Sequence, residues 1–355
     1  MRQPPISAFN YPLLPPMQTS DYDYLLPPER IAQTPLEPRH ASRLLVLPRA
    51  GGALEHRTFW DVCDYLRPGD LLVVNQTRVI PARIFARKPT GGRIELLLLR
   101  RTAENTWEAL VGGKRAAPGL TLTLEDGPQV EIVENLAGSR RLVRFAEAIE
   151  PYLERAGQMP LPPYIHTPLS DPQRYQTVYA RQPGSAAAPT AGLHFTPQLL
   201  QRLQAQGVQR AEVTLHVGLD TFAPVNEDNP LEHAIHTEWC EVSPQAAAQI
   251  NTARRAGGRI VAVGTTSVRT LETAARAAMP GETVDAFSGA TSLYILPGFE
   301  FKAVDALITN FHLPRSTLLM LVSAFAGRET ILAAYAEAVR RAYRFYSFGD
   351  AMLIL

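Results

Sequence analysis

Apolar and polar positions alternate in two different ways along the chain. After residue 190, short aliphatic runs alternate with amphipathic stretches that start at Thr196-Pro197 and Ser243-Pro244 and stop near Gly207 and Gly257. A hydroxyl residue before proline favours a helix start, and glycine favours a helix end. The predicted strands are Ser42–Leu47, Val208–Val217, Arg259–Val263 and Val304–Thr309, and further helices are predicted at Thr58–Leu66, Ser267–Ala278 and along the apolar stripe Ile331, Tyr335, Val339, Ala342 and Tyr346. Strands that alternate with helices predict an α/β fold.

Residues 70–145 have a different pattern, in which short β-like runs are separated by glycine turns such as Gly91-Gly92. The runs are Leu71–Val74, Val79–Arg87, Arg93–Leu99, Thr106–Val111, Leu120–Leu124, Val130–Val133 and Arg141–Phe145. Strands of this length and spacing are typical of a small antiparallel β-barrel. We therefore predict a small barrel domain at 70–145, inserted into a large α/β domain formed by 21–69 and 146–355.

Two proline-rich segments have no apolar period. Residues 1–20 contain five prolines and are predicted to form a flexible tail. Residues 158–190 contain seven prolines, too many for an ordinary helix or a central strand. A long irregular segment inside a compact domain is often functional, so we expect this one to border a site.

Composition narrows the class of protein. The 355 residues are 46% hydrophobic, which excludes a chain that is disordered throughout. The longest apolar stretches, such as Thr317–Ala326, are too short to cross a bilayer, and the first twenty residues lack the pattern of a secretory signal. Two cysteines, Cys63 and Cys240, are too few for a disulfide framework. We expect a cytoplasmic protein without a membrane segment.

The net charge of +1 conceals an uneven distribution of charge. Between Arg78 and Arg115 lie nine basic residues and three acidic ones, whereas residues 226–241 contain five acidic residues and no Lys or Arg. A basic face suits a phosphate backbone, although a solvated strand surface would have the same composition.

Two histidines lie at the ends of predicted elements. His194 precedes the helix that starts at Thr196, where unpaired backbone amides favour anions and an imidazole can exchange protons near neutral pH. His216 is the last polar residue of its predicted strand, on the face opposite to the apolar set. The alternatives are a hydrogen bond to a loop carbonyl for His194 and a solvent-facing strand position for His216.

Two further turns follow buried strands in the same way. Gly264-Thr265-Thr266-Ser267 leads from a strand into a helix and could bind an anion, with Arg269 beside it to pair with a carboxylate, although an ordinary strand–helix turn would look the same. Residues 310–317 carry Asn, Phe, His, Arg, Ser and Thr before the next helix. Because ligands of α/β sheets bind at the carboxyl ends of strands, we predict that these turns outline one cleft.

A metal site is a weaker alternative. Glu232, His233, His236 and Glu238 are close in sequence, but His-x-x-His lacks the i, i+4 spacing that places two imidazoles on one helical face. We expect a polar loop beside the cleft and no metal. The glycine fingerprint of a dinucleotide site is also absent, which disfavours a nicotinamide dehydrogenase.

Taken in order, the longer motifs closely resemble those of one family, the S-adenosylmethionine:tRNA ribosyltransferase-isomerases of queuosine biosynthesis. The resemblance covers all but the first twenty residues. The motifs are Asp21–Tyr24, Val73–Arg83, Pro160–Ile165, Arg174–Ala180, Ala188–Thr196, Thr214–Gly218, Val263–Arg269, Leu307–Thr317 and Ser347–Ala351. Motifs of this length, in this order, are far more specific than any short signature.

The resemblance implies both a reaction and a fold. S-adenosylmethionine is a substrate that donates its ribosyl group to the aminomethyl group of a 7-deazaguanine at the tRNA wobble position. The ribosyl group is isomerised to give epoxyqueuosine, and adenine and methionine leave. The partners are tRNA and S-adenosylmethionine, no further cofactor is implied, and we expect a monomer. The implied fold is a barrel-like α/β domain with an inserted small β-barrel.

We assign expected roles on this basis. His194 and His216 would supply acid/base chemistry, with His312 in reserve, and the Gly264–Ser267 turn with Arg269 would hold the methionine carboxylate. Tyr164, Phe195 or Phe311 would stack on adenine or on the flipped base. The other expected substrate-binding residues are Thr190, Gly192, Gly218, Asn310, Arg315 and Ser316, and those expected to bind tRNA are Arg78, Arg83, Arg93, Lys114 and Arg115.

The chain departs from the family pattern at three positions. Gln76 stands where the family usually has Asp, and Asp220 and Ala223 stand where Gly and Arg are more common. A lost carboxylate at 76 and a gained one at 220 could alter contacts with tRNA or the nucleoside. The competing interpretations are an RNA-binding protein without catalysis and a metal-dependent hydrolase that uses His233, His236 and Glu238.

Overall fold

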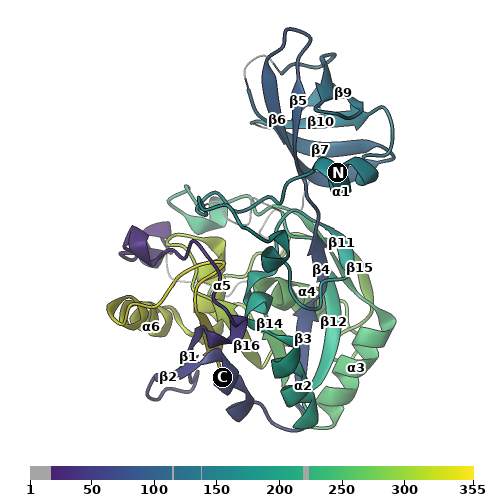
Figure 1. The fold of residues 1–355 in the computed structure, drawn as a ribbon. Helices are drawn as coiled ribbons and strands as arrows, with labels where there is room; N and C mark the ends of the chain where they lie inside the picture. Colours follow the sequence, from purple (N-terminus) through teal and green to yellow (C-terminus); the bar gives the residue numbers. More distant parts are fainter. Residues whose placement is uncertain (1–16, 114–115, 137, 219–223) are drawn as a thin grey trace.

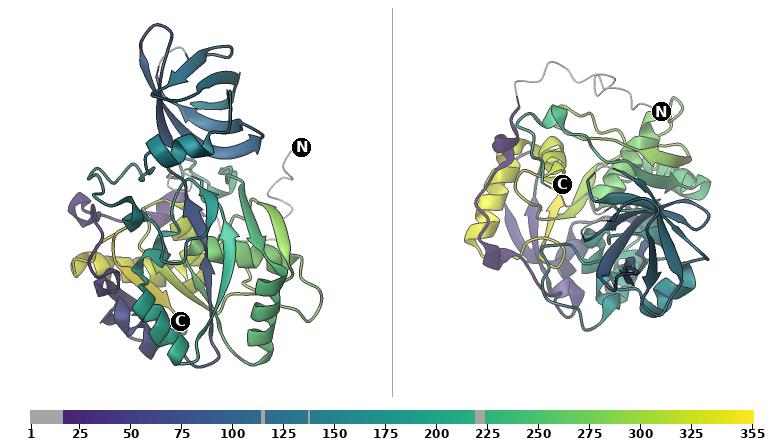
Figure 2. Two further views of the ribbon diagram at one scale, coloured as in Figure 1. Left: turned by 45° about the vertical axis from the view of Figure 1, so that its right-hand side comes forward. Right: turned by 90° about the horizontal axis from the view of Figure 1, so that it is seen from above.

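The protein consists of a small β-barrel that stands on a larger α/β domain (Figures 1 and 2). The computed structural model describes residues 17–113, 116–136, 138–218 and 224–355. Six strands close the barrel in the order β10-β7-β6-β5-β8-β9. They are β5 (Arg83–Arg87), β6 (Arg93–Ala103), β7 (Thr106–Val111), β8 (Thr121–Leu124), β9 (Gln129–Asn135) and β10 (Arg140–Phe145). The α/β class and the antiparallel barrel predicted from the sequence are confirmed.

The barrel has a hydrophobic core of its own. Trp107 and Phe145 pack inside it with aliphatic side chains from all six strands. Tyr152, from helix α1 (Glu150–Ala156), packs into the same cluster. Inward-facing residues recur at every second position of a strand. The prediction of the barrel rested on the short β-like runs and on the glycine turns that separate them.

The larger domain is built on a nine-stranded mixed sheet with the order β15-β13-β12-β3-β14-β16-β17-β1-β2. The strands are β1 (Arg43–Leu47), β2 (Glu55–Thr58), β3 (Leu71–Asn75), β12 (Gln209–Leu215), β13 (Glu238–Val242), β14 (Ile260–Val263), β15 (Phe287–Thr291), β16 (Ala306–Asn310) and β17 (Ala351–Ile354). The four central strands β12, β3, β14 and β16 are parallel. Their carboxyl ends therefore meet at one edge of the sheet. From that edge β3 continues through β4 (Thr77–Val79), which pairs with β11 (Gln182–Ser185), into the barrel.

Helices cover both faces of this sheet. Leu71 and Val73 of β3 belong to the core cluster on the side of α3 to α6, whereas Leu72 and Val74 belong to the cluster on the side of α2. Because both faces are covered, β3, β14 and β16 are buried at every position, as is typical of parallel strands. The helices are α2 (Pro197–Ala205), α3 (Pro244–Arg255), α4 (Thr265–Arg276), α5 (Thr317–Ala326) and α6 (Arg328–Arg340).

The structure differs from two of the predictions made for the large domain. Its sheet is open rather than barrel-like, because within the described ranges its edge strands β15 and β2 do not pair with each other. The run Leu71–Val74, which the sequence pattern placed in the insert, lies at the centre of the large sheet as β3. A continuous aliphatic run is typical of a strand covered on both faces, whereas barrel strands alternate. The barrel strands begin only at Arg83.

Three terminal or connecting segments also differ from the sequence prediction. The helix expected at 58–66 is a 3₁₀ helix, η5 (Phe59–Asp64). The C-terminal helix α6 ends at Arg340 because Ala342 has a φ of 58°. Residues 1–16 of the predicted tail lie outside the described residues, but Thr19 is fully buried and its N–H donates to Asp228 O at 2.8 Å. The folded body therefore begins before residue 20.

No single helix in the described part of the chain is long and apolar enough to cross a membrane. The bent pair α5 and α6, which meet at 114°, reaches the required length and composition only when the two helices are taken together.

Candidate active site

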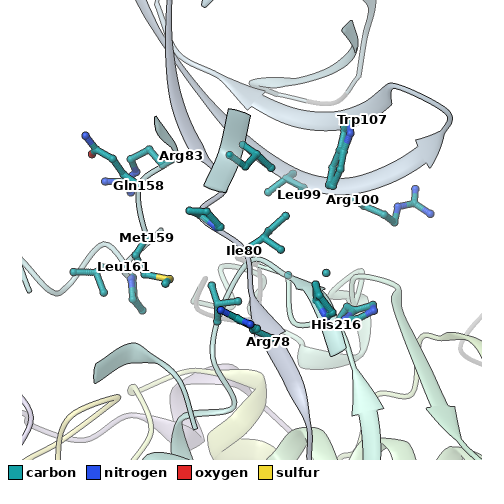
Figure 3. A pocket seen from close by; sticks show the side chains of 18 of the residues that line it. Arg78, Ile80, Arg83, Leu99, Arg100, Trp107, Gln158, Met159, Leu161 and His216 are labelled. Carbon is teal, nitrogen blue, oxygen red and sulfur yellow. The ribbon is translucent and has the colours of Figure 1, made fainter. Parts of the chain in front are cut away.

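A cavity of about 1910 Å³ lies between the barrel and the carboxyl edge of the large sheet, and we call it the interdomain cleft. Figure 3 shows Arg78 and His216 on the side of the large domain and Leu99 and Trp107 on the side of the barrel. The proline-rich segment supplies a further wall through Gln158, Met159, Leu161 and their neighbours up to Leu169, so it borders the cleft as expected. Pockets for small molecules usually have about 300–1000 Å³. This cleft is large enough to admit part of a macromolecule.

His216 follows β12 directly and is held from three sides. Its Nδ1 lies 2.8 Å from Thr77 Oγ1, and its ring stacks on Trp239 with the ring centroids 5.1 Å apart and the planes at 20°. On the third side, a Cβ added to Gly184 would lie 2.8 Å from His216 Cε1. Partial burial lowers the pKa of His216. The imidazole is therefore neutral near pH 7 and can accept a proton.

A smaller cavity of about 60 Å³ lies where three turns meet at the same edge of the sheet. The turns come from the end of the proline-rich segment, from the start of α4 after β14, and from the end of β16. The residues of the expected site that line it are Tyr164, Thr190, Gly264, Thr265, Thr266, Asn310, Phe311, His312 and Ser316. The structure thus brings together three turns from separate parts of the chain, at residues 188–191, 264–266 and 309–316.

Polar atoms that lack a partner line this smaller cavity. Thr266 Oγ1 and Asn310 Oδ1 are buried and have no hydrogen-bond partner in the described residues. Gly264 caps α4 with a φ of 85°, and Thr265 and Thr266 form the first turn of the helix. Backbone N–H groups in a first helical turn have no intrahelical partner and favour an anion. This set of donors fits a carboxylate, although the cavity would have to widen before it could hold a whole nucleoside.

His312 is buried against the smaller cavity. Its Nε2 lies 2.8 Å from Thr309 Oγ1, and its backbone N–H donates to the Tyr335 hydroxyl at 2.9 Å. Burial lowers the pKa of His312 to about 3. The ring therefore stays neutral at physiological pH and cannot act there as a proton donor in the imidazolium form.

His194 is buried beside the smaller cavity without lining it. Its Nδ1 lies 2.8 Å from Ser42 Oγ, and its ring stacks on Phe59 with a centroid distance of 4.9 Å. Burial lowers the pKa of His194 to about 3, and the neighbouring Asn310 side chain opposes this shift only in part. His194 Nε2 and Asn310 Oδ1 have no hydrogen-bond partner among the described residues beyond the contact between these two side chains. The two side chains therefore orient each other.

The three histidines do not share one cavity, as the predicted single cleft would require. His216 lines the interdomain cleft, whereas the next residue, Val217, lines the smaller cavity. Consecutive residues of an extended chain point to opposite sides, so the two spaces adjoin each other across the end of β12. Of the three expected histidines, His216 alone reaches the cleft.

The sequence model of the family described as "Queuosine biosynthesis protein" matches residues 19–354. This chain belongs to that family. A protein of Symbiobacterium thermophilum named S-adenosylmethionine:tRNA ribosyltransferase-isomerase is 58% identical, over 96% of this chain and 100% of its own length. A protein of Moorella thermoacetica with the same name is also 58% identical, over the same shares of the two chains.

A solved structure is similar as well. The crystal structure of S-adenosylmethionine tRNA ribosyltransferase from Thermotoga maritima has a TM-score of 0.55 and 43% sequence identity, and it covers 95% of this chain and 100% of its own. The family that the motifs indicated is confirmed.

Two of the aromatic residues expected to stack on a base are completely buried. Phe195 packs edge-on against Phe59 at 5.0 Å, whereas Phe311 borders the smaller cavity. Tyr164 lines the smaller cavity, and its hydroxyl lies 2.8 Å from Ser347 Oγ. An aromatic residue next to a turn is equally suited to pack under it, as Phe195 does.

Arg269 does not face the anion-binding turn. Its guanidinium pairs with Glu238, and its Nε donates to Leu293 O at 3.1 Å. The side chain lines neither cavity. The contact expected between Arg269 and a substrate carboxylate is therefore not favoured by this geometry, and the first turn of α4 remains as the anion-binding group.

The other expected binding residues have mixed surroundings. Gly218 lines the cleft and its N–H donates to Glu238 at 2.9 Å. Gly192 is buried, and a Cβ there would lie 2.1 Å from the Tyr179 hydroxyl, so packing alone requires glycine. Ser316 caps α5 and lines the smaller cavity, whereas Arg315, with a φ of 55°, lines neither cavity.

The basic side chains of the barrel are largely paired with acids. Arg83 lies 3.2 Å from Glu95, and Arg93 lies 3.1 Å from Glu125. Exposed ion pairs of this kind are weak and can be exchanged for phosphate contacts. Arg78 is exposed, lines the cleft and makes no ion pair in the described part of the chain. Lys114 and Arg115 lie outside the described residues.

The residues of the alternative metal site have separate partners. His233 Nδ1 lies 2.8 Å from Glu227 Oε2, whereas His236 Nε2 lies 3.3 Å from Glu238 Oε1. No group of three or more His, Cys, Asp or Glu residues in the described ranges is arranged to hold a metal ion. The structure therefore does not support the metal-dependent hydrolase.

Gln76 is the departure from the family pattern that can be located. It lies between β3 and β4, and its side-chain amide donates to Thr214 Oγ1 on the neighbouring strand at 3.2 Å. An uncharged donor at this position stabilises the strand pair and adds no charge at the edge of the sheet. Asp220 and Ala223 lie outside the described residues.

Three neighbours of His216 were missed by reasoning from sequence. Thr77 and Gly184 come from β4 and β11, and Trp239 from β13. Thr77 could have been found, because it follows a continuous aliphatic run whose carboxyl end belongs at the edge of a parallel sheet. Gly184 and Trp239 depend on how distant segments pack, and no local pattern marks them.

Proposed function

We propose that this chain transfers the ribosyl group of S-adenosylmethionine to the aminomethyl group of a 7-deazaguanine at the tRNA wobble position and isomerises it. The products would be epoxyqueuosine in tRNA, adenine and methionine. Membership of the family and the name shared by its relatives support the enzyme class. The observation that carries the site is the interdomain cleft, where the large domain presents neutral His216 and Arg78 opposite the barrel. Arg78 makes no ion pair among the described residues. S-adenosylmethionine enters as a substrate, and the proposed reaction needs no further cofactor.

His216 acts in this proposal as the general base. The sulfonium charge acidifies the neighbouring C5′ proton, so a base of moderate pKa can remove it. The His216 imidazole is neutral near pH 7, and Thr77 and Trp239 hold it in one orientation. His194 and His312 are neutral but enclosed, so we assign them the positioning of Asn310 and of the turn after β16 rather than proton transfer.

The other parts of the substrates would be bound by polar and charged groups of the two cavities. The first turn of α4, with the unpartnered Thr266 hydroxyl, suits the methionine carboxylate. Arg78 and the exchangeable pairs of Arg83 and Arg100 suit the phosphates of the anticodon stem-loop. Because phosphate contacts release counterions, tRNA affinity should fall steeply as salt rises.

The direct test is product analysis. The protein is incubated with S-adenosylmethionine and tRNA that carries the aminomethyl-deazaguanine, and the digested nucleosides are analysed by mass spectrometry. We expect a modified nucleoside that has gained the isomerised ribosyl group, with one adenine released per nucleoside. The same tRNA with unmodified guanine is the control and should gain no mass. No mass gain on the modified tRNA, in an assay where a ribosyltransferase of known activity succeeds, would refute the proposal.

Replacing Gly184 with alanine should slow the reaction without removing any functional group. The new Cβ would lie 2.8–2.9 Å from the His216 ring, which would have to leave Thr77. A misplacement of about 1 Å can cost about 10²-fold in rate, so we expect a loss of that order in the single-turnover rate at unchanged tRNA affinity.

Gly91→Ala is the matched control for this change. Gly91 also has a positive φ, of 87°, but no atom lies within 4 Å of an added Cβ. The Gly91→Ala variant therefore introduces a side chain at a positive φ, as Gly184→Ala does, but the new Cβ clashes with no neighbouring residue. Equal rates for the two alanine variants would contradict the role of Gly184.

A further inference from the structure

Two tryptophans line the interdomain cleft, and the chemistry described so far uses only one face of one of them. Trp107, on the barrel, is 6% exposed and belongs to the barrel core. Trp239, on β13, is half-buried, and its indole stacks on His216 with the ring centroids 5.1 Å apart. In the described part of the chain, no other aromatic ring and no guanidinium contacts this indole.

The neighbour of Trp239 on its other side is small. Because β13 lies between β12 and β15, the pairing register places His216 on one side of Trp239 and Ala290 on the other. Ala290 is exposed and lines the cleft together with Trp239. A methyl group is too short to cover an indole face. We call the space above Ala290, beside the face of Trp239 that is turned away from His216, the stacking site.

The surroundings of the stacking site favour an uncharged ring over a phosphate. Residues 226–241 contain five acidic residues and no Lys or Arg, and Glu241 lies on the same face of β13 as Trp239. The basic residues that line the cleft, such as Arg78 and Arg100, come from other elements. A nucleic-acid strand in the cleft would therefore place phosphates on the basic walls, whereas an unstacked base can stack on an aromatic side chain.

The stacking site is too far from His216 for the base that reacts. Stacked aromatic rings have their centroids about 4.5–7 Å apart, so a base on the outer face of Trp239 would lie roughly 10–12 Å from the His216 ring. Reacting atoms must approach to about 3–3.5 Å. A base in the stacking site would thus belong to a neighbouring nucleotide of the same strand.

We propose that Trp239 and Ala290 bind a base of the anticodon loop that adjoins the reacting nucleotide. This inference rests on the proposed function, which brings the loop into the cleft. Every base has a π-face, so the stacking site would add affinity for tRNA and hold the loop open without reading its sequence. The indole would then contact the general base on one face and the tRNA on the other.

The test fills the stacking site without removing a group. The Ala290→Leu side chain would occupy the space above residue 290, and Ser288→Leu is the matched control, because Ser288 is exposed on the same face of β15 but does not line the cleft. Affinity is measured with tRNA that carries unmodified guanine at the wobble position, so no turnover occurs. Ala290→Leu should bind it about 5–150-fold more weakly, the effect of losing one stacked base, whereas Ser288→Leu should bind like the wild type. Equal melting temperatures would show that both variants are folded.

Two further comparisons distinguish stacking from other causes. Trp239→Phe should retain most of the affinity and Trp239→Leu should lose it, because only the first keeps an aromatic face. Stacking releases no counterions, so Ala290→Leu should keep the wild-type slope of log Kd against log salt, whereas Arg78→Gln should reduce the slope by about one.

An abasic nucleotide in the tRNA identifies the bound base. It is placed directly before or directly after the wobble position. At one of these positions it should weaken binding to the wild type by the same factor as Ala290→Leu does, and the two changes together should cause no further loss.

Three results would overturn the stacking site: wild-type affinity in Ala290→Leu, additive losses at both abasic positions, or a greater requirement for S-adenosylmethionine in place of weaker tRNA binding. The last would mean that adenine stacks there. Because binding is measured without turnover, these results leave the product test of the proposed function unaffected. If the wild-type protein did not bind tRNA, the proposed function and the stacking site would both be refuted.

Discussion

Replacing His216 with alanine is expected to reduce product formation by about 10³-fold in a single turnover, within the range of about 10²–10⁴ that positioned acid/base groups contribute. The variant would lose the neutral imidazole that Thr77 and Trp239 hold toward the cleft. The Thr77 hydroxyl and the face of Trp239 would be exposed to water, which can replace their contacts but cannot be held in the same orientation. Affinity for tRNA should be nearly unchanged, because His216 is neutral and contributes no charge to phosphate binding.

His56→Ala is the matched control for this prediction. His56 Nδ1 also lies 2.8 Å from a hydroxyl, that of Tyr343, and the His56 ring packs against the aromatic ring of the same tyrosine. His56 does not line the cleft. Its replacement should leave the single-turnover rate unchanged. The measurement is the rate of nucleoside formation with both substrates saturating. An unchanged rate in His216→Ala would remove this residue from the mechanism.

Acid should unfold this protein well before its carboxylates are protonated. Burial lowers the pKa of both His194 and His312 from 6.5 to about 3. Between these values the unfolded chain binds a proton at each of the two positions and the folded protein does not, so stability is complete above about pH 6.5 and falls as the pH falls. Linkage over these shifts gives a loss of about 4–5 kcal/mol in the free energy of unfolding between pH 6.5 and 4.5.

The pH window identifies the groups responsible. The pKa of Glu238 is lowered to about 2, so its contribution to stability is lost only below its unfolded value, near pH 4.5. Urea unfolding at a series of pH values from 7 to 4.5 measures the loss. In His194→Gln, which titrates at only one of the two positions, the slope of stability against pH should be about half as steep. A stability that stays level down to pH 5 would show that the two rings are accessible to protons in the folded state.

Most of the fold was predictable because its periodicity is local. Alternation of inward and outward residues is imposed on each barrel strand by its own pleat, and helix boundaries such as Thr196-Pro197 and Ser243-Pro244 were set by their capping chemistry. The strand at Leu71–Val74 was assigned to the wrong domain because a continuous aliphatic run does not indicate which sheet the strand joins. Pairing between β3 and its neighbours β12 and β14 decides that, and these strands are more than 130 residues away in the chain.

The site was predictable in part. The turns at Gly264 and Asn310 and the histidine after β12 were expected at one edge of the sheet because parallel strands align their carboxyl ends. Their division between two cavities was not predictable, because it depends on which side of β12 each side chain leaves. The pairing of Arg269 with Glu238 was also hidden, since an arginine beside a glycine turn suits an external carboxylate and an internal one equally well.

The order of residues alone was sufficient to establish the α/β class, the inserted barrel and the family, because each depends on patterns that are read along one stretch of chain. Packing of distant segments decided the rest. It enclosed His194 and His312, left His216 and His236 half-buried beside the cleft, and gave these two histidines different partners. The physical reason is that burial and charge pairing control the pKa and orientation of an imidazole, and both are properties of neighbours that come from elsewhere in the chain.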